Sequence, residues 1–176
     1  MTTSIRPARP DDLAAIVQLV RDLAAYEREP DAVHATVEHF RAALFPDDAA
    51  PTAFCHVACV RENGEEQVVG LAVWFLSFST WTGTNGIWLE DLFVRPEFRG
   101  LGLGRALLAT LAGICTERGY HRLEWWVLDW NAPSIAFYES IGARAQDEWT
   151  RYRLDGVALA ALTSWDQSPD QSPGSR

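Results

Sequence analysis

Hydrophobic positions recur at helical spacing in the first part of the chain. They are Leu13, Ile16, Val17, Val20, Leu23 and Ala24. On a helix these positions form one buried stripe, and Pro30 follows, so the helix is expected to end at residues 26–29. Thr36 can cap a second, shorter helix over residues 36–45. Residues 4–7 are expected to form a short β-strand before both helices.

Apolar runs in the middle of the chain predict three antiparallel strands, over residues 53–61, 67–78 and 87–94. The Asn63-Gly64 pair between the first two runs is a strong signal for a tight hairpin turn. A polar loop over residues 79–86 is expected to join the second and third strands.

After these three strands the pattern of hydrophobic positions changes and favours alternating helices and strands. A glycine-rich link precedes a helix predicted over residues 103–118, with Gly119 as its C-terminal stop. The remaining elements are a strand over 121–130, a helix over 131–140, a strand over 145–154 and a weak helix near 157–162. The strand–helix–strand passage implies a right-handed crossover and a parallel pair. The fold class is therefore α/β with a mixed sheet.

The length of 176 residues, 48% of them hydrophobic, fits one domain with a sizeable core. We expect residues 1–163 to form that single domain. Residues 164–176 carry a tandem Asp-Gln-Ser-Pro repeat and are predicted to be a disordered polar tail. No apolar run is long enough to span a bilayer, and the N-terminus lacks the apolar stretch of a signal peptide, so a cytoplasmic location is expected.

The charge balance limits the classes of molecule that the chain is expected to bind. The chain has 24 acidic and 15 basic side chains, a net charge of −9, and every basic residue is arginine. Such a chain should repel nucleic acid and anionic membranes, and it suits a cationic substrate, although solubility alone also favours negative charge. Cys55, Cys59 and Cys115 are odd in number and lack zinc-site spacing, so we expect reduced thiols and no metal.

The strongest local motif is Arg99-Gly100-Leu101-Gly102-Leu103-Gly104-Arg105, which follows a strand and opens a helix. Glycines let the backbone approach a bulky anion, and first-turn N–H groups and arginines can bind phosphate. A tight turn that merely needs glycine is the alternative. The absence of lysine excludes a P-loop, and a dinucleotide fingerprint would need a third glycine where Arg105 stands.

Two further motifs combine polar groups with apolar surroundings. Glu90 and Asp91 interrupt an apolar strand, where a carboxylate is unfavourable unless it is paired or functional, and alternation places them on opposite faces. Asn131, Ser134 and Tyr138 share one face of the helix that Asn131 can cap. An ordinary capped helix with a tyrosine at its rim also explains this second motif.

Together these motifs resemble GNAT-superfamily N-acetyltransferases of the diamine (spermidine/spermine) type and their thialysine-acetylating relatives. The resemblance extends over residues 4–162 and depends chiefly on the strings at 89–94, 99–104 and 130–138. It implies the GNAT fold: a mostly antiparallel mixed sheet with a parallel splayed pair at its centre, flanked by helices. It also implies acetyl-CoA as co-substrate, a small cationic amine as acceptor and a homodimer.

The resemblance assigns roles to individual residues. Tyr138 would be the general acid that protonates the departing thiolate, and Glu90 would contact the amine and help to remove its proton. The implied acetyl-CoA site is Leu92, Phe93, Val94, Arg99, Gly100, Leu101, Gly102, Leu103, Gly104, Arg105, Asn131, Ala132, Pro133 and Ser134. The implied amine site is Tyr26, Glu27, Glu90, Asp91, Glu124, Trp126 and Glu148.

One departure from the diamine pattern concerns the substrate. The diamine enzymes carry an acidic residue before Trp81 that helps to hold a distal ammonium, whereas this chain reads Phe78-Ser79-Thr80 there. A shorter diamine, thialysine or another small primary amine therefore stays open beside a long polyamine. The alternative functions are a catalytically silent CoA-binding sensor or partner module and, more distantly, a nicotinamide-dependent dehydrogenase.

Overall fold

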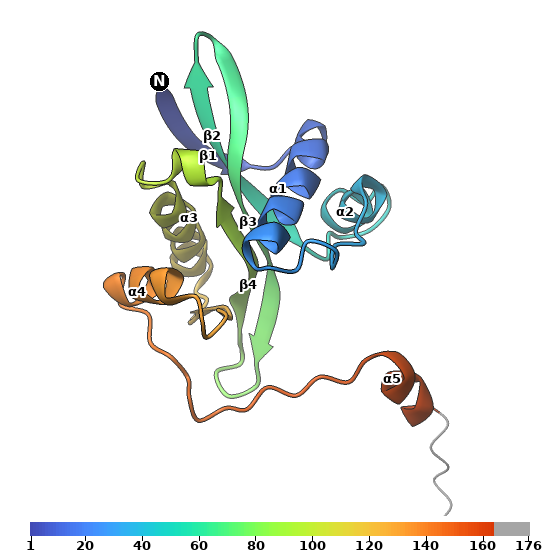
Figure 1. The fold of residues 1–176 in the computed structure, drawn as a ribbon. Helices are drawn as coiled ribbons and strands as arrows, with labels where there is room; N and C mark the ends of the chain where they lie inside the picture. The colour runs from blue at the N-terminus through green and yellow to red at the C-terminus, as the bar shows by residue number, and fades with distance from the viewer. Residues whose placement is uncertain (164–176) are drawn as a thin grey trace, which may run out of the picture. The chain divides into compact units, whose positions relative to one another are not determined.

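The computed structural model describes residues 1–163 (Figure 1). The chain divides into two compact units, Met1–Trp126 and Val127–Arg176, which we describe separately. The polar tail predicted at residues 164–176 lies outside the described residues. Among the described residues, none of the helices combines the length and the apolar character that crossing a membrane requires.

The first unit is built on a five-stranded sheet in the order β1-β2-β3-β4-β5. Its strands are β1 (Thr2–Pro7), β2 (Phe54–Glu62), β3 (Glu65–Ser79), β4 (Thr84–Val94) and β5 (Leu123–Glu124). Neighbours pair antiparallel except β4 and β5, which are parallel. The predicted hairpin turn is confirmed, because Asn63 and Gly64 adopt φ values of 51° and 88° between β2 and β3.

Helices cover both faces of this sheet. In the first unit they are α1 (Leu13–Tyr26), α2 (Val37–Leu44) and α3 (Leu103–Arg118), with 3-10 turns at Pro10–Asp12 and Pro96–Phe98. Helices α1 and α2 lie on one face and α3 on the other (Figure 1). The second unit contains α4 (Ala132–Ser140) and α5 (Gly156–Leu162). The predicted helices are thus confirmed.

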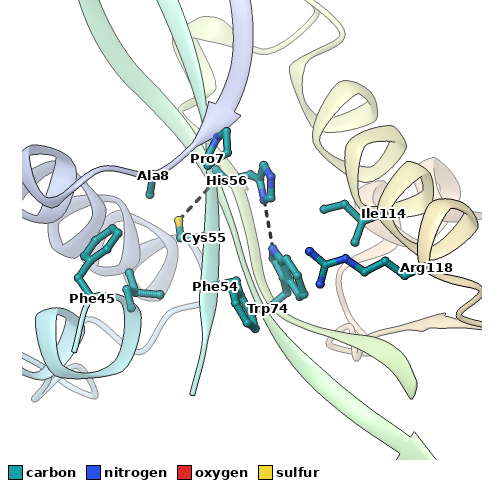
Figure 2. Close-up of a pocket in the computed structure, with 10 residues that line it drawn as sticks. Pro7, Ala8, Phe45, Phe54, Cys55, His56, Trp74, Ile114 and Arg118 are labelled. Atoms are coloured by element: carbon teal, nitrogen blue, oxygen red, sulfur yellow. Dashed lines mark hydrogen bonds between the residues drawn. The ribbon is translucent and has the colours of Figure 1, made fainter. Parts of the chain in front are cut away.

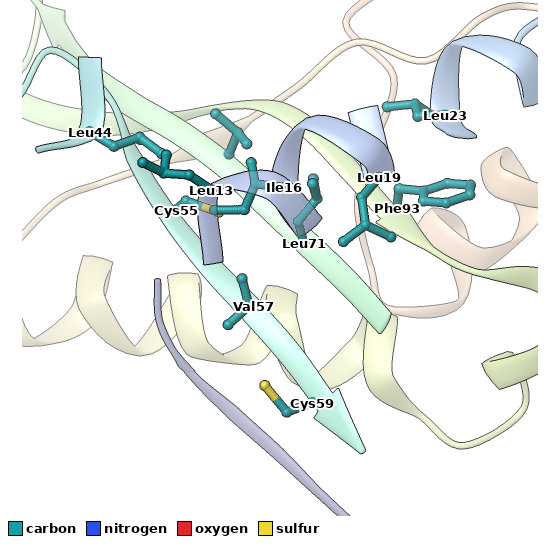
Figure 3. Packing of buried hydrophobic residues seen from close by; sticks show 11 residues of the cluster. Leu13, Ile16, Leu19, Leu23, Leu44, Cys55, Val57, Cys59, Leu71 and Phe93 are labelled. Carbon is teal, nitrogen blue, oxygen red and sulfur yellow. The ribbon is translucent and has the colours of Figure 1, made fainter. Parts of the chain in front are cut away.

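The core between α1 and the sheet follows from the apolar stripe. Leu13 and Ile16 of α1 belong to one buried cluster with Val57 and Leu71 of the sheet (Figure 3). Leu19, which the predicted stripe omits, is fully buried in the same cluster. Burying side chains of this size stabilises the fold by about 1.5–3 kcal/mol each, so this layer anchors α1 firmly.

Four details of the predicted sheet are wrong. The strand expected over residues 121–130 is reduced to Leu123–Glu124, and residues 145–154 form no strand. The parallel pair consequently lies at an edge of the sheet and not at its centre. Only Leu123–Glu124 pair with β4, and residues 145–154 join no ladder in the described part of the chain. The β3–β4 loop is also shorter than expected, because β4 begins at Thr84.

Candidate active site

A β-bulge in β4 shapes the candidate site. Asp91 pairs with Val73 of β3 and Leu89 pairs with Trp74, which leaves Glu90 between them as an extra residue. The parallel ladder with β5 ends just before the bulge, at the Trp88–Glu124 pair. A bulge bends its strand, re-aims side chains and ends pairing, so the two strands separate at Glu90. The alternation that would place Glu90 and Asp91 on opposite faces is interrupted there.

Three carboxylates interact beside the bulge. The pKa of Asp91 is raised to about 6, first by burial and then by the charges of Glu90 and Glu27. Burial also raises the pKa of Glu27, which follows the last residue of α1. Clustered carboxylates of this kind favour a bound cation, because an ammonium group relieves their mutual repulsion. These are three of the predicted amine-site residues, brought together from α1 and β4.

Tryptophans flank the same carboxylates. The indole Nε1 of Trp88 donates to Glu90 Oε2 at 3.0 Å, and the Trp88 ring meets Trp126 edge to face with centroids 4.6 Å apart. Trp126 therefore contacts the tryptophan that binds Glu90, and its place in the amine site stays a prediction. Glu124 instead forms an ion pair with the residue just before its strand, with Arg122 Nε 2.7 Å from its Oε2.

The glycine turn before α3 has the geometry of an anion site. Gly100 and Gly102 adopt φ values of 81° and 74°, and a Cβ on either would meet no atom within 4 Å. No side chain caps α3, and its first backbone bond is Ala106 N to Gly102 O at 3.0 Å. The backbone N–H groups of the first turn are thus available to an anion, and the residues present fit the diphosphate of acetyl-CoA.

Arg99 is held against α1 at the start of this turn. Its Nε donates to the Val94 carbonyl at 3.1 Å. Its guanidinium lies 4.9 Å from the centre of the Tyr26 ring and 5.8 Å from that of Phe93. Predicted residues of the amine site and of the acetyl-CoA site therefore touch through one side chain.

The other predicted residues, from Asn131 onward, belong to the second unit. Asn131 caps α4 as predicted, since its Oδ1 accepts from Ser134 N at 3.3 Å. Within the same helix the Tyr138 ring centroid lies 5.4 Å from that of Phe137. Glu148 is exposed in a segment without regular structure. The catalytic role of Tyr138 and the amine contact of Glu148 stay predictions.

A separate hollow of about 290 Å³ lies where β1 ends, and it contains none of the predicted site residues (Figure 2). Trp74 Nε1 donates to His56 Nδ1 there at 3.1 Å, and Phe54 stacks on Trp74 with centroids 4.5 Å apart. Burial lowers the pKa of His56.

The sequence reasoning missed the bulge and the bond from Trp88 to Glu90. Neither glycine nor proline marks the bulge, so no turn signal was available. The one usable signal was the placement of a tryptophan two residues before an acid in an apolar strand.

The fold and the site together define an N-acetyltransferase: a bulged strand separating from its parallel neighbour, acids beside it, and a glycine turn that opens a helix. Residues 16–143 match the model of the Acetyltransferase (GNAT) family. The chain belongs to this family.

Similar proteins agree with this assignment. Thialysine N-epsilon-acetyltransferase of Bos taurus is 37% identical over 165 residues, covering 90% of this chain and 95% of the relative. Spermidine/spermine N(1)-acetyltransferase-like protein 1 of Homo sapiens is 29% identical over 93% of this chain and 24% of its own length. Among solved structures, an integron cassette protein from the mobile metagenome of V. cholerae has a TM-score of 0.75 at 25% identity, covering 94% of this chain and 99% of that chain.

Proposed function

We propose that the protein transfers the acetyl group of acetyl-CoA to a primary amine of a small cationic substrate, by direct attack in a ternary complex. The observation that supports this most strongly is the carboxylate cluster of Glu27, Glu90 and Asp91, beside the bulge and in the same unit as the glycine turn. Membership of the GNAT family supports acetyl-CoA as the acyl donor.

The acids address the central chemical problem, which is the proton on the amine. An alkylammonium group with a pKa of ~10.4 leaves only about one molecule in a thousand neutral at pH 7. Asp91 and Glu27 attract the cation, and Glu90 accepts its proton through water. The neutral nitrogen then attacks the carbonyl carbon, and its proximity supplies much of the rate.

Backbone groups and a phenol complete the proposed reaction. Bound acetyl-CoA supplies the activated acetyl group. The backbone of Leu92, Phe93 and Val94, which the ladder with β5 does not reach, holds the pantetheine arm and polarises the carbonyl. Residues 99–105 hold the diphosphate, and residues 131–134 line the other side of the ligand. Tyr138 donates a proton to the departing thiolate.

Thialysine and short diamines are the proposed acceptors. The relatives named for thialysine support this choice. Ser79, which replaces the expected acid, is 8% exposed, and its Oγ accepts from Thr82 N at 3.3 Å. A neutral hydroxyl that is already engaged provides no distal anchor for a long polycation, so spermine should be acetylated least efficiently.

The test is to mix the protein with acetyl-CoA and thialysine, ornithine, putrescine, spermidine or spermine. Released thiol and product mass are measured together. We expect turnover with thialysine and a loss of at least about a hundredfold in Tyr138→Phe, the size of a lost general acid. Stabilisation by CoA without turnover on any amine would favour the silent CoA-binding module instead.

A homodimer is part of the proposal. Trp149, Tyr152 and Val157 in the second unit are 70%, 90% and 87% exposed, which is unusual for large apolar side chains. A second copy of the chain would cover them. Light scattering should give a mass twice that of the 19.6 kDa chain, and a monomer mass at micromolar concentration would contradict the dimer.

A further inference from the structure

We propose that Trp88 is a positioning residue that orients Glu90 through its indole N–H and leaves the second carboxylate oxygen for the substrate. The inference rests on the proposed function, because it assigns Trp88 a role in the reaction that Glu90 serves. Trp88 lies outside the sequence strings on which the resemblance chiefly depends, and outside the carboxylate cluster of Glu27, Glu90 and Asp91.

Trp88 and Glu90 are joined directly by a hydrogen bond between their side chains. Trp88 Nε1 lies 3.0 Å from Glu90 Oε2, and this is a charge-assisted hydrogen bond between residues two apart on β4. An indole is a donor only, with one hydrogen, so it can neither take the proton of the amine nor occupy both oxygens. Oε1 of Glu90 therefore remains available to the ammonium group or to the water that relays its proton.

The indole is itself held in place. Trp88 pairs across the ladder with Phe75, whose ring centroid lies 6.4 Å away. On its other side it meets Trp126 at 4.6 Å with an interplanar angle of 79°. A ring packed between two aromatic neighbours has little freedom to turn, so it offers a fixed donor.

Glu90 needs such a donor because of where it stands. As the extra residue of the bulge it lacks a partner in the β3 ladder, and its side chain is exposed. A free glutamate side chain populates several rotamers, of which few direct a carboxylate at a reacting amine. The bond to Trp88 selects among them before the substrate binds, which is the purpose of a preorganised site.

The first experiment tests the bond without any substrate. The chain has eight tryptophans, and the indole signal of Trp88 in a ¹H–¹⁵N spectrum is assigned by its loss in Trp88→Phe. We expect this signal to move upfield in Glu90→Ala and to stay in place in Glu97→Ala, a matched control on the 3-10 turn after β4. An unchanged Trp88 signal in Glu90→Ala would overturn the inference.

The second experiment is a double-mutant cycle on kcat/KM with thialysine. Trp88→Phe keeps an aromatic ring and removes the donor, and we expect a loss of about tenfold, the size of one charge-assisted hydrogen bond. In the Glu90→Ala background the same change should cost less than about twofold. Tyr120→Phe is the control, because it also removes a polar hydrogen from an aromatic ring and Tyr120 lies after α3, outside the predicted site.

The outcomes separate the inference from the proposed function. Trp88→Phe could lower kcat/KM by the same factor in the unaltered protein and in Glu90→Ala. This result would show that Trp88 only packs, and it would overturn the positioning role without affecting the proposed enzyme activity. No turnover by the unaltered protein on any amine would overturn the proposed function and the role of Trp88 in it, even if the indole signal confirms the bond.

Discussion

The guanidinium of Arg99 lies 4.9 Å from the centre of the Tyr26 ring, so the turn before α3 rests on the last residue of α1. The next residue after Tyr26 is Glu27, one of the clustered acids. A bond from Arg99 Nε to the Val94 carbonyl fixes the same side chain to the end of β4. The side of the site proposed for the amine and the side proposed for the diphosphate thus share one contact.

The Tyr26–Arg99 contact should matter for CoA binding. In Tyr26→Ala the guanidinium loses its aromatic support, a cation–π contact of about 0.5–1 kcal/mol, and we expect CoA affinity to fall roughly two- to fivefold. Tyr26→Phe keeps the ring face and should bind CoA as the unaltered protein does. Calorimetric titration with CoA, in the absence of amine, measures both. Equal affinities of the two variants would refute the contribution of the contact.

Substituting Gly102 should distinguish a loss of CoA affinity from a loss of stability caused by backbone strain. At φ 74° an alanine costs roughly 1–2 kcal/mol of folding free energy, and its Cβ would project into the open space at the start of α3. Gly83 in the β3–β4 turn has a φ of 67° and equally open surroundings, so Gly83→Ala is the matched control. Both variants should lose similar stability in urea unfolding, whereas only Gly102→Ala should lose CoA affinity, by about tenfold or more.

Gly70 should be essential to the junction of β2, β3 and β4. A Cβ there would lie 2.8 Å from the Phe93 carbonyl oxygen and 3.3 Å from the Ala58 Cβ. Because the first of these contacts is with backbone, Gly70→Ala should destabilise the protein by about 1–3 kcal/mol. Gly113→Ala, in the interior of α3 with nothing within 4 Å, should stabilise it by about 0.5–1 kcal/mol. Urea unfolding of the two variants would show opposite signs.

Local signals in the sequence were sufficient for most elements. Helix α3 occupies the predicted residues 103–118, since glycines at 102 and 119 mark its ends. Glu90 and Asp91 were also singled out, because a carboxylate within an apolar strand stands out. These features depend on a few neighbouring residues, and periodicity and turn chemistry encode them directly.

The features that failed depend on distant partners. The strand expected over residues 145–154 is absent, since a strand forms only where another backbone offers hydrogen bonds. The bulge at Glu90 arises from the register of β3 against β4, which neither strand specifies alone. The contact between Arg99 and Tyr26 likewise joins residues from different elements. Only the assembled sheet reveals such relationships.

Asp91 should make folding stability depend on pH. Its pKa is raised to about 6 in the folded protein, from 3.8, by burial and by Glu90 and Glu27. The folded state therefore binds the proton more tightly than the unfolded state. The resulting stability is fully present below about pH 4 and is lost as the pH rises through 6.

Asp91→Asn should remove this dependence, because an amide cannot ionise. The variant and the unaltered protein should have similar free energies of unfolding at pH 4, and the variant should be more stable at pH 8 by on the order of 2–3 kcal/mol. Asp48→Asn, at an exposed aspartate outside the cluster, is the control and should show no such gain. Urea unfolding at half-unit pH steps measures the difference. A constant difference between pH 4 and pH 8 would mean that the Asp91 carboxyl ionises alike in both states.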